Sequence, residues 1–320
     1  MITVLFALAL LAGGTILLLK GADWFVDGAG DLASALGVSA LILGVLLAGL
    51  EPEEMLTAAI ASARGAPTLA VGNVIGTNFT MVTVALGLSA LIFPMAISAR
   101  VRRPALIATL VSVLPVVLLF LGVVTQLEGV LLLLVFAGYT IFLFQTDREA
   151  MKRIAEVDDD DDDEKQEQPE RLRFRWKPVV LVFGGLAAMA AGGPAIVEGA
   201  IRFAQIVGLS QAAVGATIVS LGTGAEMIAL GISAARKKRS DILVGAILGS
   251  FAYNLLVTLG LAATIHALPV DLKLTFIALP AMIIAHLMLL ALVWYGKIPR
   301  VMGGLLVGAY IAYLFVVVRV

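Results

Sequence analysis

Hydrophobic runs long enough to cross a bilayer recur along the whole chain, separated by short polar turns. A membrane-spanning helix needs about 20 mainly apolar residues, and the pattern predicts ten such helices in two groups of five. Their expected ranges are 2–34, 39–64, 68–94, 103–123 and 127–146, then 177–207, 210–235, 241–266, 272–296 and 299–318. The sequence therefore predicts an all-α integral membrane protein.

The composition supports this class. Of the 320 residues, 61% are hydrophobic and only 14% are charged, whereas a soluble domain is roughly 45–50% apolar. The chain has no cysteine, which excludes disulfides and thiol chemistry, and its net charge of -1 gives no reason to expect a nucleic-acid partner. The expected surroundings are a lipid bilayer.

One strongly polar segment, residues 147–176, separates the two groups of helices. It contains EVDDDDDDEKQEQPE, in which Asp158–Asp163 form an unbroken acidic run. Such a run repels itself and cannot bury a core, so we expect a disordered linker. A regulatory calcium site is the alternative, but no glycine-containing loop with ligand spacing is present. The chain then divides into a first repeat (1–146), the linker (147–176) and a second repeat (177–320).

Basic residues predict how the chain is oriented. Of the 22 Lys and Arg residues, 17 lie in loops that follow odd-numbered helices and 3 lie on the other face; without the linker the counts are 9 and 3. Because Lys and Arg collect on the cytoplasmic side, we expect a multi-pass protein of the cell membrane. Its linker would be cytoplasmic and both termini would lie outside.

The two halves resemble each other in three blocks that follow in the same order. The first-half segments VDGAGDLASALGVS (26–39), EMLTAAIASARG (54–65) and GNVIGTN (72–78) match VEGAIRFAQIVGLS (197–210), EMIALGISAARK (226–237) and GAILGSF (245–251), at offsets of 171, 172 and 173. Five helices per half would place the second half upside down in the membrane. Inverted repeats of this kind are typical of secondary transporters.

Acidic residues occur at matching positions within the repeats. The stretch LAGLEPEEML (47–56) carries Glu51, Glu53 and Glu54, and Glu54 corresponds to Glu226. An acid near the bilayer centre costs roughly 2.5–3.5 kcal/mol or more, so a matched pair indicates a functional site. Glu53 corresponds to an alanine and is expected to be a helix-start acid.

The helices are expected to be broken beside these acids. Pro52 interrupts the second helix, and Gly222 and Gly224 loosen the seventh. Broken helices at membrane depth are tolerated where they line a cavity, and their free carbonyl groups can coordinate a cation.

The third and eighth helices add oxygen ligands. Asn73 and Thr77 are four residues apart, as are Ser250 and Asn254, and Thr77 corresponds to Ser250. Carboxylate, amide and hydroxyl oxygens suit hard cations such as Na⁺ and Ca²⁺. The two histidines, His266 and His286, fall outside the repeated motifs and are interpreted as structural or interfacial.

These motifs resemble the cation/calcium exchanger superfamily, whose two repeats carry G-T-S-x-P-E and G-N-x-I-G-S-N. The resemblance implies ten helices and a mid-membrane site with two essential acids, here Glu54 and Glu226. It implies oxygen ligands at Thr77 and Ser250, and an acid or amide at Asn254. The transported cations (Ca²⁺, Na⁺ or H⁺) would be the ligands, and no cofactor is implied.

The sequence departs from the family pattern in ways that leave the choice of ion open. AGLEPEE lacks the Thr-Ser pair and has the extra acid Glu51, GTGAE retains Thr223 but lacks the serine and proline, and Met81 stands opposite Asn254 in the repeat. We expect an antiporter with alternating access; a proton-coupled Ca²⁺ or Mg²⁺ exchanger is the alternative, because a buried carboxyl can carry a proton. A passive cation channel would share the acidic lining, but inverted repeats favour alternating access. An intramembrane enzyme is not expected, because no His- or Cys-rich site is present.

Overall fold

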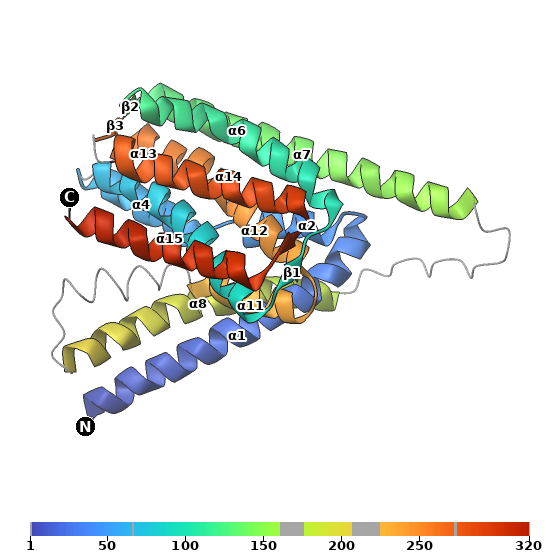
Figure 1. Ribbon diagram of the computed structural model, residues 1–320, viewed down its shortest axis with the longest axis horizontal. Helices are drawn as coiled ribbons and strands as arrows, with labels where there is room; N and C mark the ends of the chain where they lie inside the picture. The colour runs from blue at the N-terminus through green and yellow to red at the C-terminus, as the bar shows by residue number, and fades with distance from the viewer. Residues whose placement is uncertain (1, 66, 161–175, 207–224, 272–273, 320) are drawn as a thin grey trace.

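The computed structural model describes residues 2–65, 67–160, 176–206, 225–271 and 274–319. The helices are α1 (Ile2–Leu36), α2 (Ala40–Leu43), η1 (Gly44–Ala48), α3 (Pro52–Ala63), α4 (Pro67–Thr80), η2 (Met81–Ala85), α5 (Leu86–Ile92), η3 (Ala99–Val101), α6 (Arg102–Phe120), α7 (Gln126–Asp160), α8 (Trp176–Ile206), α11 (Ala225–Arg236), α12 (Ser240–Tyr253), η5 (Asn254–Thr258), α13 (Leu259–Ile265), η6 (Leu274–Ala278), α14 (Leu279–Tyr295) and α15 (Arg300–Arg319). The strands are two-residue pairs: β1 (Met95–Ala96) with β4 (Lys297–Ile298), and β2 (Val123–Val124) with β3 (Leu268–Pro269). Figure 1 shows the helices lying side by side as a bundle.

The all-α membrane class is confirmed. Within the described ranges, seven helices are long and apolar enough to cross a bilayer. They are Val4–Leu36, Ala70–Ile92, Ala99–Phe120, Gln126–Arg148, Trp176–Ile196, Ser240–Ile265 and Thr275–Tyr295. Two shorter apolar helices, Glu54–Ala63 and Arg300–Phe315, fall within two further ranges that the sequence predicted.

The secondary structure of the first half recurs about 173 residues later. The offset relates α3 to α11, α4 to α12, η2 to η5 and α5 to α13. It also carries β1 onto β3, and an offset of 174 carries β2 onto β4, so the pair β1–β4 corresponds to the pair β3–β2. Figure 1 shows β2 and β3 at one end of the bundle and β1 toward the other.

Helices α1 and α8 form a closely packed pair. Glycines on both helices permit this approach: a Cβ atom added at Gly21 would lie 2.7 Å from the carbonyl oxygen of Gly185, and one added at Gly185 would lie 2.6 Å from that of Gly21. Small residues of this kind let membrane helices meet backbone to backbone. Figure 1 shows the pair along one side of the bundle.

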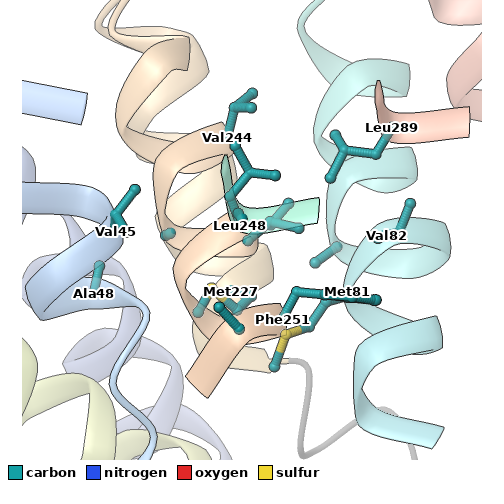
Figure 2. Close-up of a cluster of buried hydrophobic side chains, with 14 of the residues drawn as sticks. Val45, Ala48, Met81, Val82, Met227, Val244, Leu248, Phe251 and Leu289 are labelled. Atoms are coloured by element: carbon teal, nitrogen blue, oxygen red, sulfur yellow. The ribbon is translucent and has the colours of Figure 1, made fainter. Parts of the chain in front are cut away.

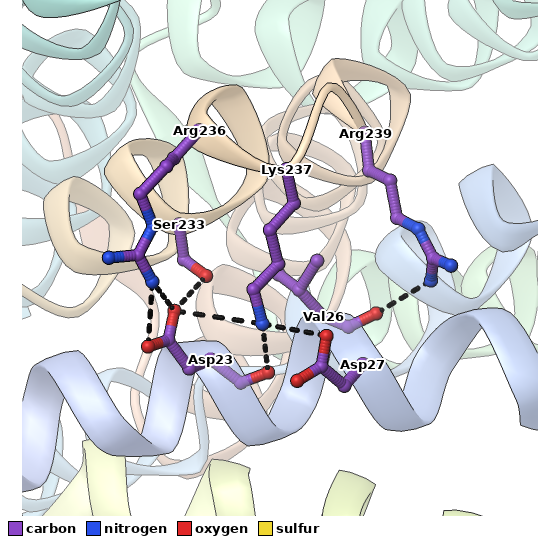
Figure 3. A network of polar contacts seen from close by, with 7 residues as sticks. All are labelled: Asp23, Val26, Asp27, Ser233, Arg236, Lys237 and Arg239. Atoms are coloured by element: carbon purple, nitrogen blue, oxygen red, sulfur yellow. Dashed lines mark hydrogen bonds and ion pairs between the residues drawn. The ribbon is translucent and has the colours of Figure 1, made fainter.

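A polar network joins α1 to the end of α11. The Asp23 carboxylate accepts hydrogen bonds from Ser233 Oγ and Arg236 Nη2, each at 2.6 Å. Lys237 Nζ lies 2.7 Å from Asp27 Oδ1 (Figure 3). These contacts hold the C-terminal end of α11 against α1, and so help to position Glu226 at its other end.

Helix α12 lies at the centre of the bundle, and nearly all its residues are buried. Figure 2 shows Val244, Leu248 and Phe251 of this helix between Val45 of η1 and Val82 of η2. Glycines again set the spacing between helices, since a Cβ atom at Gly249 would collide with the Val45 carbonyl oxygen. The second helical range is thereby held directly against α12.

The prediction of a disordered linker is wrong for its first part. Helix α7 continues beyond the expected span (127–146) as far as Asp160. The segment EAMKRIAEV (149–157) consists mostly of good helix formers. Extending an existing helix also avoids the cost of nucleation. The rest of the acidic run, Asp161–Asp163, lies outside the described residues.

Candidate functional site

The second helical range is broken where the acids lie. The π-helix η1 ends at Ala48, and α3 begins at Pro52. Between them Glu51 has φ -125° and ψ 75°, and its side chain makes no capping bond to α3. Proline fits the first position of a helix, because its missing N–H would have no partner there. The break therefore leaves the Glu51 carboxylate to turn toward another helix.

That carboxylate is bound by α12 and η5. Glu51 is only 6% exposed, and its Oε2 accepts hydrogen bonds from Ser250 Oγ at 2.5 Å and from Asn254 Nδ2 at 2.9 Å. The segment that carries Glu51 can approach α12 this closely because of Gly49, where a Cβ atom would lie 2.6 Å from the Ser250 backbone nitrogen. Three residues predicted as ligands are thus brought together from both halves of the chain.

The amide of Asn254 has further polar neighbours. Its Nδ2 lies 3.4 Å from Asn78 Oδ1, and its Oδ1 accepts a hydrogen bond from Thr258 Oγ1 at 3.1 Å. Ser250 Oγ also lies 3.0 Å from Met81 Sδ. Sequence reasoning did not identify Asn78 or Thr258. A pattern in the sequence could have identified Thr258, because a polar residue occurs at every fourth position (250, 254 and 258) of an otherwise apolar helix.

Glu54 belongs to a separate contact within the first half. This residue is 6% exposed, and its Oε2 accepts a hydrogen bond from Asn73 Nδ2 of α4 at 2.5 Å. Thr77 is buried one turn further along the same helix. The first-half acid and the amide of the third helix are therefore paired.

A pocket joins acids from the two halves. Its volume is about 360 Å³, and Glu51, Pro52 and Glu226 are among its lining residues. The other lining residues are apolar: Leu47, Ala48, Leu50, Phe183, Leu186, Ala187, Met189, Ala190, Met227 and Leu230. Glu54 does not line this pocket, so Glu51 is the first-half acid that shares a cavity with Glu226.

Glu226 lies in the first turn of α11, where the helix macrodipole favours a negative charge. It approaches α8 at Gly193, because a Cβ atom at that glycine would lie 3.0 Å from Glu226 Oε1. Thr223 lies outside the described residues, as does the predicted break at Gly222 and Gly224. Among the described residues, no group of three or more His, Cys, Asp and Glu side chains could hold a metal ion. A cation here would instead meet one or two carboxylates together with neutral oxygens.

Comparison with known proteins identifies the family. The model of the sodium/calcium exchanger protein family matches residues 6–145 and 177–319. The chain is 32% identical to the sodium/calcium exchanger MaX1 of Methanosarcina acetivorans, covering 99% of each sequence. It is 29% identical to the putative antiporter CaxA of Alkalimonas amylolytica, covering 94% of this chain and 95% of that protein.

A solved structure agrees. The sodium-calcium exchanger NCX_Mj, in crystals soaked with Na⁺ and Sr²⁺, superposes with a TM-score of 0.79 at 26% identity, over 97% of this chain and 98% of that one. Both similarities cover the helices of the two halves, on either side of the linker, and so identify the family of the whole chain. The chain belongs to the sodium/calcium exchanger family, and is a membrane-spanning cation antiporter rather than an enzyme.

Proposed function

We propose that the protein exchanges Na⁺ for Ca²⁺ by alternating access around a site between its two halves. The observation that carries the proposal is the buried Glu51 carboxylate, which is bound by Ser250 and Asn254 of the other half and shares a pocket with Glu226. Acids at this depth are costly and mark ion pathways. The relatives support the pair of ions, because MaX1 is a sodium/calcium exchanger and NCX_Mj crystals were soaked with Na⁺ and Sr²⁺.

The proposed ligands combine charge with neutral oxygens. Glu51, Glu54 and Glu226 supply carboxylates, and Thr77, Ser250 and Thr223 supply hydroxyl oxygens. Hard cations favour such oxygen sets. Asn254 differs, because it meets Glu51 through its amide nitrogen. The first and second halves therefore contribute different chemistry to one site near the bilayer midplane.

We further propose ten helices arranged as two inverted repeats. The support is the recurrence of helices, π-helices and strand pairs at an offset of about 173 residues. Figure 1 shows both termini toward one end of the bundle and β1 toward the other. Basic residues follow β1 and α11, and Lys and Arg collect on the cytoplasmic side. This supports a cytoplasmic linker and termini that lie outside.

A proton-coupled Ca²⁺ or Mg²⁺ exchanger is the second candidate. The observation that favours it is the presence of two buried acids, Glu51 and Glu54, at one helix break. A carboxyl group that is excluded from water can exchange a bound cation for a proton.

Flux into liposomes tests these proposals. Purified protein is reconstituted, and ⁴⁵Ca²⁺ uptake is measured with outward gradients of Na⁺, H⁺ or neither. A sodium/calcium exchanger takes up Ca²⁺ only against Na⁺, and a proton-coupled exchanger only against H⁺. Uptake that needs no counter-ion would identify a passive channel and overturn the antiport proposal.

A further inference from the structure

The second half of the site contains a polar residue, Thr258, to which nothing above assigns a role. Thr258 lies one turn beyond Asn254, and these two residues begin and end the π-helix η5. Both are fully buried. π-Helical turns occur frequently at functional sites, and this one keeps the two side chains in hydrogen-bonding contact.

We propose that Thr258 is a positioning residue, which fixes the Asn254 amide so that its nitrogen faces Glu51 and its oxygen faces away from the cation. The contacts define this orientation at both ends of the amide. Thr258 Oγ1 donates to Asn254 Oδ1 at 3.1 Å, and Asn254 Nδ2 donates to Glu51 Oε2 at 2.9 Å. An ionised carboxylate only accepts hydrogen bonds, so Glu51 takes the NH₂ group of Asn254. The amide oxygen then needs a donor, which the Thr258 hydroxyl group supplies.

The repeat supports a linked role for the pair. At the same offset in the first half, Asn254 corresponds to Met81 and Thr258 to Ala85, within the matching π-helix η2. Both polar groups are thus present in one half and both are replaced by apolar groups in the other. A threonine needed only for helix packing would not be expected to occur together with the amide.

The inference rests on the proposed function and makes it more specific. With its oxygen held by Thr258, Asn254 is not a ligand of the transported cation but a hydrogen-bond donor that competes with the cation for Glu51. A buried carbonyl that loses its donor is costly. An amide released from Thr258 would therefore turn its oxygen toward the cation and stabilise the bound state.

The test compares two substitutions of one residue. Thr258→Val removes the hydroxyl while keeping the branched shape, and Thr258→Ser keeps the hydroxyl. Binding of CaCl₂ and NaCl to the purified protein is followed by the shift in thermal unfolding, and maximal exchange is measured in liposomes. We expect Thr258→Val to lower the half-saturating Ca²⁺ concentration about ten-fold, with maximal exchange less affected, and Thr258→Ser to match the unmodified protein.

A second measurement separates positioning from structure. In an Asn254→Leu background there is no amide to orient, so Thr258→Val should have no further effect on half-saturation. Three results would overturn the inference: half-saturation within two-fold of the unmodified protein in Thr258→Val, the same change in Thr258→Ser, or an undiminished effect without Asn254. Failure of the proposed function is seen separately, as absence of counter-ion-dependent flux in the unmodified protein. A protein that binds neither cation overturns both.

Discussion

Replacement of Glu51 by glutamine tests the site most directly, because it removes one charge and keeps the shape. Glutamine retains an oxygen that can accept from Ser250 or Asn254, so the fold should survive. What changes is the attraction of a cation to the site. At about 4 Å and an effective dielectric constant near 20, a unit charge attracts a monovalent cation by about 4 kcal/mol and a divalent one by about twice that.

Desolvation offsets much of this attraction, so the measured loss should be smaller. Hydrogen bonds to charged groups exceed neutral ones by roughly 1–1.5 kcal/mol, which sets a scale of about ten-fold for Na⁺. The loss for Ca²⁺ should be about twice as large in free energy, and so about a hundred-fold. The free-energy loss for Ca²⁺ should be twice that for Na⁺ whatever fraction of the attraction remains after desolvation, because the ratio follows from the charge of the cation.

The assay is half-saturation by each cation, measured by thermal shift on purified protein and by initial rate in liposomes. Glu53→Gln is the matched control, because it removes the same charge two residues away. Equal losses for Na⁺ and Ca²⁺ would show that the substitution acts through geometry and not charge. No loss for either cation would remove Glu51 from the site.

Three further predictions follow from the same contacts. Glu226→Gln should abolish exchange while Glu53→Gln retains it, because a buried cation without a counter-charge is strongly disfavoured. Equal flux losses in the two variants would contradict the assignment of Glu226 as the essential acid. Gly193→Ala should weaken Ca²⁺ binding several-fold, because its methyl group would lie 3.0 Å from Glu226 Oε1. Gly184→Ala, on the same helix with nothing within 4 Å, should have no effect, and equal effects of both would point to helix packing instead. Deletion of residues 156–168 should leave liposome flux within a few-fold, since this acidic segment has few apolar residues with which to pack; complete loss in a folded deletion variant would assign the segment a role in transport.

The membrane class and the correspondence between the halves could be predicted from the sequence because both depend on local pattern. Hydropathy marks each span, and an offset between similar segments needs no knowledge of tertiary contacts. The extent of α7 could not be predicted in this way. A strongly polar composition suggested disorder, but helix propagation from a stable span carries the helix on to Asp160.

The arrangement of the acids could be predicted only in part. Pro52 correctly indicated a break in the second helix, but the break leaves several directions open to Glu51. Its direction is fixed by a partner helix about 200 residues away, which approaches closely because Gly49 and Gly249 have no side chains. Sequence spacing paired Glu54 with Glu226, whereas the pocket joins Glu226 to Glu51.

The two halves share an order of elements along the chain but carry different side chains at their breaks. The helices and π-helices of the two halves correspond along the chain, yet the first half supplies Glu51 and Glu54 and the second supplies Glu226 alone among the described acids of the breaks. Glu226 is partly exposed, while Glu51 is almost completely buried in the wall of the same pocket. A cation in this pocket would therefore lie near both acids, of which Glu51 is the more deeply buried. Because the deeper acid is held by Asn254, binding there requires the cation to replace a hydrogen bond, and this exchange provides a physical basis for selecting between ions of different charge.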